Sequence, residues 1–245
     1  VDPRDSNVVF VAAQGPLWSS GGERGLYKTS DGGLSWELVL SKGPWTGVTD
    51  IVLDPRNPDV VIAATHQRHR TVAALLNGGP ESGIHKSTDG GKTWHELKRG
   101  LPSGDKGKIA LAISPQKPDI VYATIEMANR AGGVFRSEDV GASWTKMSDY
   151  MSGGTGPHYY QEIWADPHRF DVLYHANVVL GRSEDGGATW NGVGNSAKHV
   201  DNHAVAFHPT DPDFLLVGCD GGLYKSFDRG ATYDFAENLP LTQFY

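Results

Sequence analysis

The sequence is poor in the features that mark several large protein classes. Cys219 is the single cysteine among 245 residues, so no intrachain disulfide can form and a zinc site of four cysteines is excluded. No apolar run approaches the roughly 18 residues of a membrane-spanning helix. No block of lysine or arginine occurs, and the net charge is −7. We therefore expect no membrane span and no nucleic-acid partner.

Helical periodicity is also missing, and so are the short motifs of common enzyme classes. No segment has a convincing amphipathic pattern, and there is no nucleophile elbow, phosphate loop or dinucleotide fingerprint. The chain has instead 31 glycines, 14 prolines and 10% aromatic residues. This composition is typical of many short strands joined by tight turns, and it predicts an all-β protein.

One eight-residue motif, [S/T]-x-D-x-G-x-[S/T]-[W/Y], occurs five times. The copies are TSDGGLSW (29–36), STDGGKTW (87–94), SEDVGASW (137–144), SEDGGATW (183–190) and SFDRGATY (226–233). The aspartate can accept backbone N–H groups within a turn, and the glycines permit positive φ. A calcium loop would need more acidic ligands than the one or two that each copy offers. We therefore predict a structural role for the five motif aspartates: Asp31, Asp89, Asp139, Asp185 and Asp228.

A second motif alternates with the first, and together the two define five units. It occurs at 1–13, 53–65, 113–125, 165–177 and 207–219, for example as LDPRNPDVVIAAT. In the unit 47–98, the runs GVTDIVLD, VVIAATH, GIHKST and KTWHELK predict four strands separated by turns. Four antiparallel strands per repeat of about 40–50 residues are typical of a β-propeller blade. The predicted blades are 1–45, 46–103, 104–152, 153–197 and 198–245.

The eight-residue motif is identified as the Asp-box, or BNR repeat. It occurs in sialidases, in xyloglucan-cleaving hydrolases with two seven-bladed propellers, and in the ten-bladed sortilin domain. The segments LLNGGPESGIHKSTDGGKTW, HYYQEIWADP, HVDNHAVAFHP and LLVGCDGGLYKSFDRGATY resemble the bacterial BNR-repeat "glycosyl hydrolase" and sortilin-N-terminal-like proteins. The resemblance implies an exported protein, secreted, periplasmic or at the cell surface. It also favours a piece of a larger propeller assembly over a closed five-bladed ring, since relatives are several times longer.

The blade pattern separates two rims. If the strands alternate in direction, both repeated turns lie on one rim, and the variable loops lie on the other, where sites are usually built. We expect the variable rim and the channel mouth to carry the ligand-binding residues. The candidates are His66, Arg68, His69, Arg70, Glu126, His158, Tyr159 and Tyr160.

Two further constellations carry possible chemistry. His199, Asp201 and His203 alternate in HVDNH and would share one face of a strand, as ligands of a metal ion or as a hydrogen-bond network. Glu162 and Asp201 are the carboxyl pair nominated for glycoside cleavage, with Glu126 in reserve. The arginine triad of sialidases is not evident.

The favoured function is a binding or scaffold module that holds a glycan, a peptide or a partner domain on the variable rim. The alternative is a glycoside hydrolase or lyase that uses Glu162 and Asp201. A structural part of a larger protein is the third reading. No cofactor is required by any motif.

Overall fold

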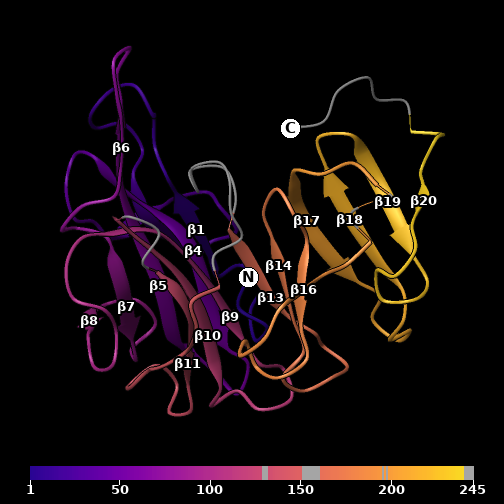
Figure 1. The fold of residues 1–245 in the computed structure, drawn as a ribbon. Helices are drawn as coiled ribbons and strands as arrows, with labels where there is room; N and C mark the ends of the chain where they lie inside the picture. Colours follow the sequence, from indigo (N-terminus) through magenta and orange to yellow (C-terminus); the bar gives the residue numbers. More distant parts are fainter. Residues whose placement is uncertain (129–131, 151–160, 195, 197, 240–245) are drawn as a thin grey trace.

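The computed structural model describes residues 1–128, 132–150, 161–194, 196 and 198–239, and all regular structure in them is β. Twenty strands form five antiparallel sheets that follow one another along the chain (Figure 1). The predicted all-β propeller of about five blades is therefore confirmed, while the blade boundaries stay a prediction. Within the described residues, no helix has the length and apolarity needed to cross a membrane.

The first two sheets contain eight strands. The first is β1 (Val9–Ala13), β2 (Gly25–Thr29) and β3 (Glu37–Leu40). The second is β4 (Thr46–Asp54), β5 (Asn57–Arg70), β7 (Gly83–Ser87) and β8 (His95–Leu97), with β6 (Leu75–Asn77) paired to the far end of β5. The first sheet has three strands and lacks the innermost strand that each later sheet has.

The other three sheets have four strands each, in sequence order. They are β9 (Lys106–Ile113), β10 (Val121–Met127), β11 (Gly133–Ser137) and β12 (Thr145–Ser148); β13 (Glu162–Ala165), β14 (Leu173–Ala176), β15 (Gly181–Ser183) and β16 (Asn191–Gly192); and β17 (Asn202–Phe207), β18 (Leu215–Cys219), β19 (Gly222–Ser226) and β20 (Asp234–Phe235).

The core lies between successive sheets and not within any one of them. Strands β4, β9, β13 and β17 are the first strands of their sheets, and each contacts the next. Ile62 and Ile84 of the second sheet pack against Ile109 of the third, and all three are fully buried. Because successive strand residues point to opposite faces of the sheet, an apolar strand contributes side chains to the packing layers on both faces of its sheet.

Each Asp-box aspartate closes its own turn. Asp89 Oδ1 accepts the Ser87 hydroxyl (2.8 Å) and the Thr93 N–H (2.9 Å), and Oδ2 accepts the Thr93 hydroxyl (2.6 Å). These hydrogen bonds hold the pKa of Asp89 well below its usual range, the Thr93 hydroxyl contributing most. Gly90 and Gly91 have φ of 72° and 89°, which a side chain would strain. The carboxylate is thus used within the turn.

Cations on three of the strands that lead into an Asp-box, β2, β7 and β15, connect neighbouring Asp-box turns. Lys28 donates to the Gly90 carbonyl (2.8 Å), and Lys86 donates to the Val140 carbonyl (2.7 Å). Arg182 makes the same type of bond to the Arg229 carbonyl (3.0 Å). These carbonyls each follow the Asp-box aspartate of the next sheet, so the repeated cation fixes the register between blades.

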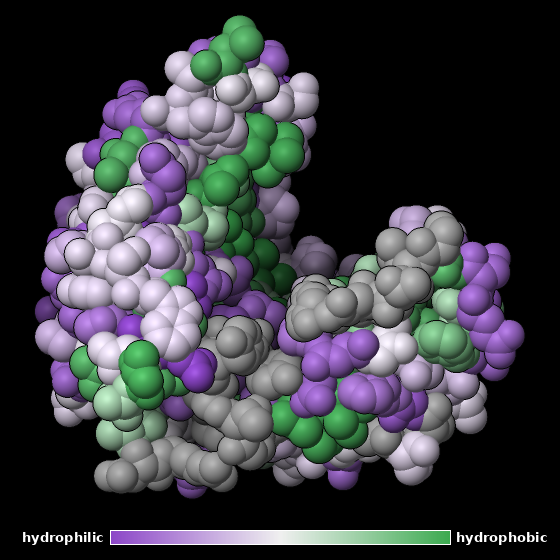
Figure 2. All heavy atoms as spheres, turned by 90° about the horizontal axis from the view of Figure 1, so that it is seen from above, coloured by the Kyte–Doolittle hydropathy of each residue, from purple (hydrophilic) through white to green (hydrophobic). Residues whose placement is uncertain are grey.

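The described residues form an open arc. The last sheet stands apart from the first in Figure 1. Figure 2, seen from above, shows a wide notch between two arms, with hydrophobic residues along the inner wall of one arm. The described part of the chain therefore does not form a closed ring.

Candidate functional site

The inner strands of three successive sheets bring three charged side chains together. Asp50 comes from β4, Lys108 from β9 and Glu162 from β13. The Lys108 ammonium forms an ion pair with the Glu162 carboxylate; the Lys108 side chain is 3% exposed and that of Glu162 is 29% exposed. Asp50 and Glu162 both line a cavity of about 290 Å³. We call Asp50, Lys108 and Glu162 the channel triad.

Asp50 is held in place by backbone amides. Its carboxyl oxygens accept the Ile51 N–H (2.7 Å) and, across the sheet boundary, the Leu111 N–H (2.6 Å). Burial raises the pKa of Asp50 to about 7, and the negative charge of Glu162 adds to the rise. The two amides and the Lys108 charge oppose it and are outweighed. Asp50 is therefore a carboxyl group that can hold and release a proton near neutral pH.

A β-bulge sets the direction of the Asp50 side chain. The pairing of β4 with β5 shifts register between Val48 and Asp50. The Thr49 hydroxyl, at the bulge, lies 3.2 Å from the Ile109 carbonyl of the next sheet. Bulges re-aim side chains and often occur beside active sites. Here the carboxyl group at the bulge reaches β9, where it accepts the Leu111 N–H.

His175 lies close to the channel triad and is fully buried. It pairs in register with Ile163, and its ring packs edge-on against Tyr150 (5.5 Å) and Trp190 (5.9 Å). Burial lowers the pKa of His175 to about 3, and the Lys108 charge adds to the effect. Neither ring nitrogen has a hydrogen-bond partner among the described residues. His175 is therefore neutral at physiological pH.

The structure places the two nominated carboxyl groups in different surroundings. Glu162 is in the site, but the carboxyl group that senses its charge is Asp50 of β4. Asp201 has a φ of 61°, and its backbone N–H donates to the Val178 carbonyl (2.9 Å) in the connection leading to β17. The Glu162 carboxylate is turned to Lys108, with which it forms an ion pair.

The predicted metal ligands are not brought together. The His203 ring pairs with Asp220 (2.6 Å), and the His199 ring lies 2.8 Å from the Val200 carbonyl. Asp201 stays outside both contacts. Over the described ranges, no group of three His, Cys, Asp or Glu side chains could hold a metal ion. The geometry of HVDNH therefore matches the hydrogen-bond alternative and not a metal centre.

Of the remaining candidates, His66, Arg68, His69 and Arg70 lie in the second half of β5, and Glu126 lies on β10. His66 is buried, and the His69 ring stacks on Trp45 with centroids 3.7 Å apart. The Glu126 carboxylate accepts the Asn77 amide at 3.2 Å. His158, Tyr159 and Tyr160 lie outside the described residues.

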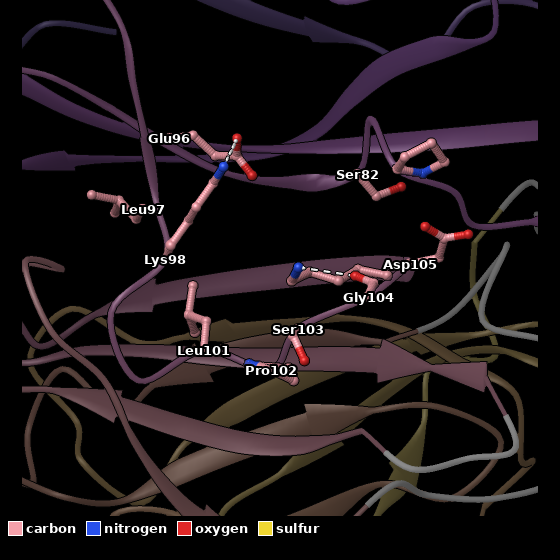
Figure 3. A pocket seen from close by; sticks show the side chains of 11 residues that line it. Ser82, Glu96, Leu97, Lys98, Leu101, Pro102, Ser103, Gly104 and Asp105 are labelled. Atoms are coloured by element: carbon pink, nitrogen blue, oxygen red, sulfur yellow. Dashed lines mark hydrogen bonds and ion pairs between the residues drawn. The ribbon is translucent and has the colours of Figure 1, made fainter.

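A larger cavity, of about 380 Å³, is open but chemically less suited (Figure 3). Three of its charged side chains already have partners: Lys98 pairs with Glu96 at 3.0 Å, and Lys106 donates to the Gly104 carbonyl at 3.2 Å. The Lys98 side chain is 74% exposed, so water screens that pair. The channel triad is the stronger candidate because Lys108 is buried and forms an ion pair with Glu162, whose charge also acts on Asp50.

Sequence reasoning missed Asp50 and Lys108. Both stand in apolar runs, GVTDIVLD and KGKIALAI, that are innermost strands of blades. A charge inside such a run is expensive to bury without a partner. This cost indicates that Asp50 and Lys108 each need a partner, but the sequence does not show which residue of another sheet provides it.

The fold and the five turns define the class: the chain is an Asp-box repeat β-propeller. The BNR/Asp-box repeat family model matches residues 85–96. Among curated proteins, a xyloglucanase of a Paenibacillus species is 25% identical over 84% of this chain and 21% of its own length. Xyloglucanase Xgh74A of Acetivibrio thermocellus is 27% identical over 77% of this chain and 25% of its own length.

Solved structures show the same fold. An ancestral GH74 enzyme matches 97% of this chain and 31% of its own, with a TM-score of 0.65 and 19% identity. The GH74 xyloglucanase of Xanthomonas campestris matches 94% of this chain and 36% of its own, with a TM-score of 0.62 and 18% identity. The chain thus spans about a fifth to a quarter of the length of the xyloglucanases it matches.

Proposed function

We propose that this propeller acts on a glycan as a glycoside hydrolase, with the channel triad as its catalytic centre. One observation carries the proposal: two carboxyl groups in one cavity occupy different electrostatic environments. Asp50 has a pKa raised to about 7, whereas Glu162 is ion-paired with Lys108. Pairs of carboxyl groups that differ in this way are the acid and the base of glycosidases. The xyloglucanases among the relatives support the substrate class.

The roles follow from the contacts. Protonated Asp50 would donate its proton to the leaving glycosidic oxygen as general acid. Ionised Glu162 would attack the anomeric carbon or activate a water molecule for that attack. Lys108 would position the Glu162 carboxylate. Carboxyl groups about 5–5.5 Å apart give retention and those about 6.5–9.5 Å apart give inversion, so the product anomer reports their working separation.

A binding module that holds a glycan without cleaving it is the second candidate. The observation in its favour is that Asp50 accepts two backbone amides, which also suits a structural link between sheets. A peptide or protein partner and further blades of a longer chain stay predictions, as does a secreted, periplasmic or cell-surface location.

Single amide substitutions test the hydrolase. Purified chain is incubated with xyloglucan and with other β-linked glucans, and new reducing ends are measured. Asp50→Asn and Glu162→Gln should each lower kcat/KM by at least about 100-fold. Asp201→Asn is the matched control and should keep full activity. Folding is checked by thermal melting. Hydrolysis that survives both amide variants, or that is lost in Asp201→Asn, would refute the assignment.

A further inference from the structure

The loop 14–24, between β1 and β2, is organised around a buried guanidinium. Arg24 is 4% exposed. It donates to the carbonyls of Gly21 (2.8 Å), Gln14 (2.8 Å) and Ser19 (2.9 Å), and also to that of Pro16. An arginine whose N–H groups donate to carbonyls of one loop holds the backbone of that loop in place. The loop is therefore a rigid structure and not a slack connection.

The second sheet supports the same loop. The Arg70 N–H donates to the Leu17 carbonyl (3.0 Å), and the Gly21 N–H donates to the Pro44 carbonyl (2.7 Å). The far end of β5, which carries Arg70, thus lies beside the loop at the end of the molecule where the β6 hairpin projects in Figure 1. Two blades cooperate to hold this surface.

The supported loop presents an exposed indole beside a cation. Trp18 is 59% exposed, and the Arg70 guanidinium lies 5.2 Å from its ring centroid. The described residues give Arg70 no ion pair. Next to them, the Trp45 ring stacks on His69, with Arg24 5.9 Å from the Trp45 centroid. We call Trp18, Arg70, Trp45 and His69 the Trp18 platform.

A rigid exposed indole has few physical uses. Leaving apolar area in water costs about 25 cal/mol per Å², so a loop built to keep Trp18 exposed points to a ligand. An exposed indole suits a flat sugar ring, whereas the anchor side chain of a peptide needs an enclosing pocket. The Arg70 guanidinium, which lies over the ring and has no ion pair among the described residues, suits a carboxylate, which arginine binds with two parallel hydrogen bonds.

We propose that the Trp18 platform binds an acidic glycan, with a pyranose ring stacked on Trp18 and a uronate carboxylate paired to Arg70. The choice of a glycan rests on the proposed function, while the aromatic–cationic geometry does not. The platform is distinct from the channel triad: its residues come from the loop 14–24, the residue before β4 and the far end of β5. It would hold a segment of the polymer and would not touch the reacting bond.

Binding is measured by calorimetry on the Glu162→Gln chain, so that hydrolysis does not interfere. The probes are an oligogalacturonide and a cello-oligosaccharide of equal length. The oligogalacturonide should bind about ten-fold tighter, and its affinity should fall with added salt. Trp18→Ala should weaken both probes by about ten-fold or more. Arg70→Gln should remove the preference for the acidic probe and leave the neutral affinity unchanged.

The controls lie on the opposite rim. Trp36→Ala removes another exposed tryptophan (45% exposed) of the same sheet, and Lys92→Gln removes an exposed cation of an Asp-box turn; both should bind as the parent does. Equal affinity for the two probes, an unchanged Trp18→Ala, or equally tight binding of an acidic peptide would overturn the proposal. If the platform binds the acidic probe but the chain hydrolyses no glycan, only the proposed function is refuted. If the chain hydrolyses a glycan but Trp18→Ala does not weaken binding, only this inference is refuted.

Discussion

Replacement of Lys108 by methionine isolates the electrostatic link of the channel triad. Methionine keeps the length of the side chain and removes the charge. Glu162 then loses its cation, and Asp50 loses the positive charge that opposes the rise of its pKa. We expect the chain to lose stability and the pKa of Asp50 to rise above about 7.

The size of the loss follows from burial. Breaking a buried ion pair by removing one partner costs about 3–5 kcal/mol, because the other charge stays buried and unpaired. Lys108 is 3% exposed, but Glu162 is 29% exposed and keeps some water. We therefore expect a lower value, about 2–4 kcal/mol in the free energy of unfolding. Lys98→Met is the control: its ion pair is exposed, and the change should cost less than about 1 kcal/mol.

A double-mutant cycle in urea measures the link. Lys108→Met, Glu162→Gln and the double variant are unfolded side by side, and the carboxyl group of Asp50 is titrated by carbon NMR. The double variant should recover about 1–3 kcal/mol relative to the sum of the single changes, since no unpaired charge remains. Strictly additive losses would show that Lys108 and Glu162 do not stabilise one another, and the reasoning about the site would fail.

Three further predictions follow from the same coordinates. Between about pH 4 and 7, Asp50 keeps its proton in the folded chain and has released it in the unfolded chain, so its contribution lowers the free energy of unfolding as pH rises. Asp50→Asn should flatten that part of the pH profile measured by urea unfolding. His175 acts with the opposite sign: with a pKa of about 3 in the folded chain, it destabilises the fold as pH falls below about 6.5, and His175→Phe should reduce the loss seen on acidification. Gly100→Ala should lower the melting temperature far more than Gly21→Ala, because a Cβ at Gly100 would meet the Trp144 carbonyl oxygen at 1.8 Å, whereas nothing lies within 4 Å at Gly21 and the φ values, 79° and 70°, are similar. Equal melting temperatures would contradict the close approach of the two backbones.

The five Asp-box turns were readable from local sequence because everything they use is local. In the second blade, Ser87, Asp89 and Thr93 lie within seven consecutive residues, and the hydrogen bonds of the turn join those same residues. The alternation of two motifs then gave the four-stranded blade and the all-β fold. Neither conclusion depends on knowing which blade touches which.

The site depended on contacts that no local pattern contains. Asp50, Lys108 and Glu162 are more than fifty residues apart in succession, and they meet because three inner strands lie side by side. The expected partner, Asp201, directly precedes β17, but the Asp50 side chain is directed by the bulge at Thr49 and the Glu162 side chain by its ion pair with Lys108. The sequence alone determined the repeated turns and the propeller class, because those follow from short-range hydrogen bonding and strand periodicity. Only the tertiary structure decided which charges share a cavity, because burial and Coulomb coupling depend on distances between blades.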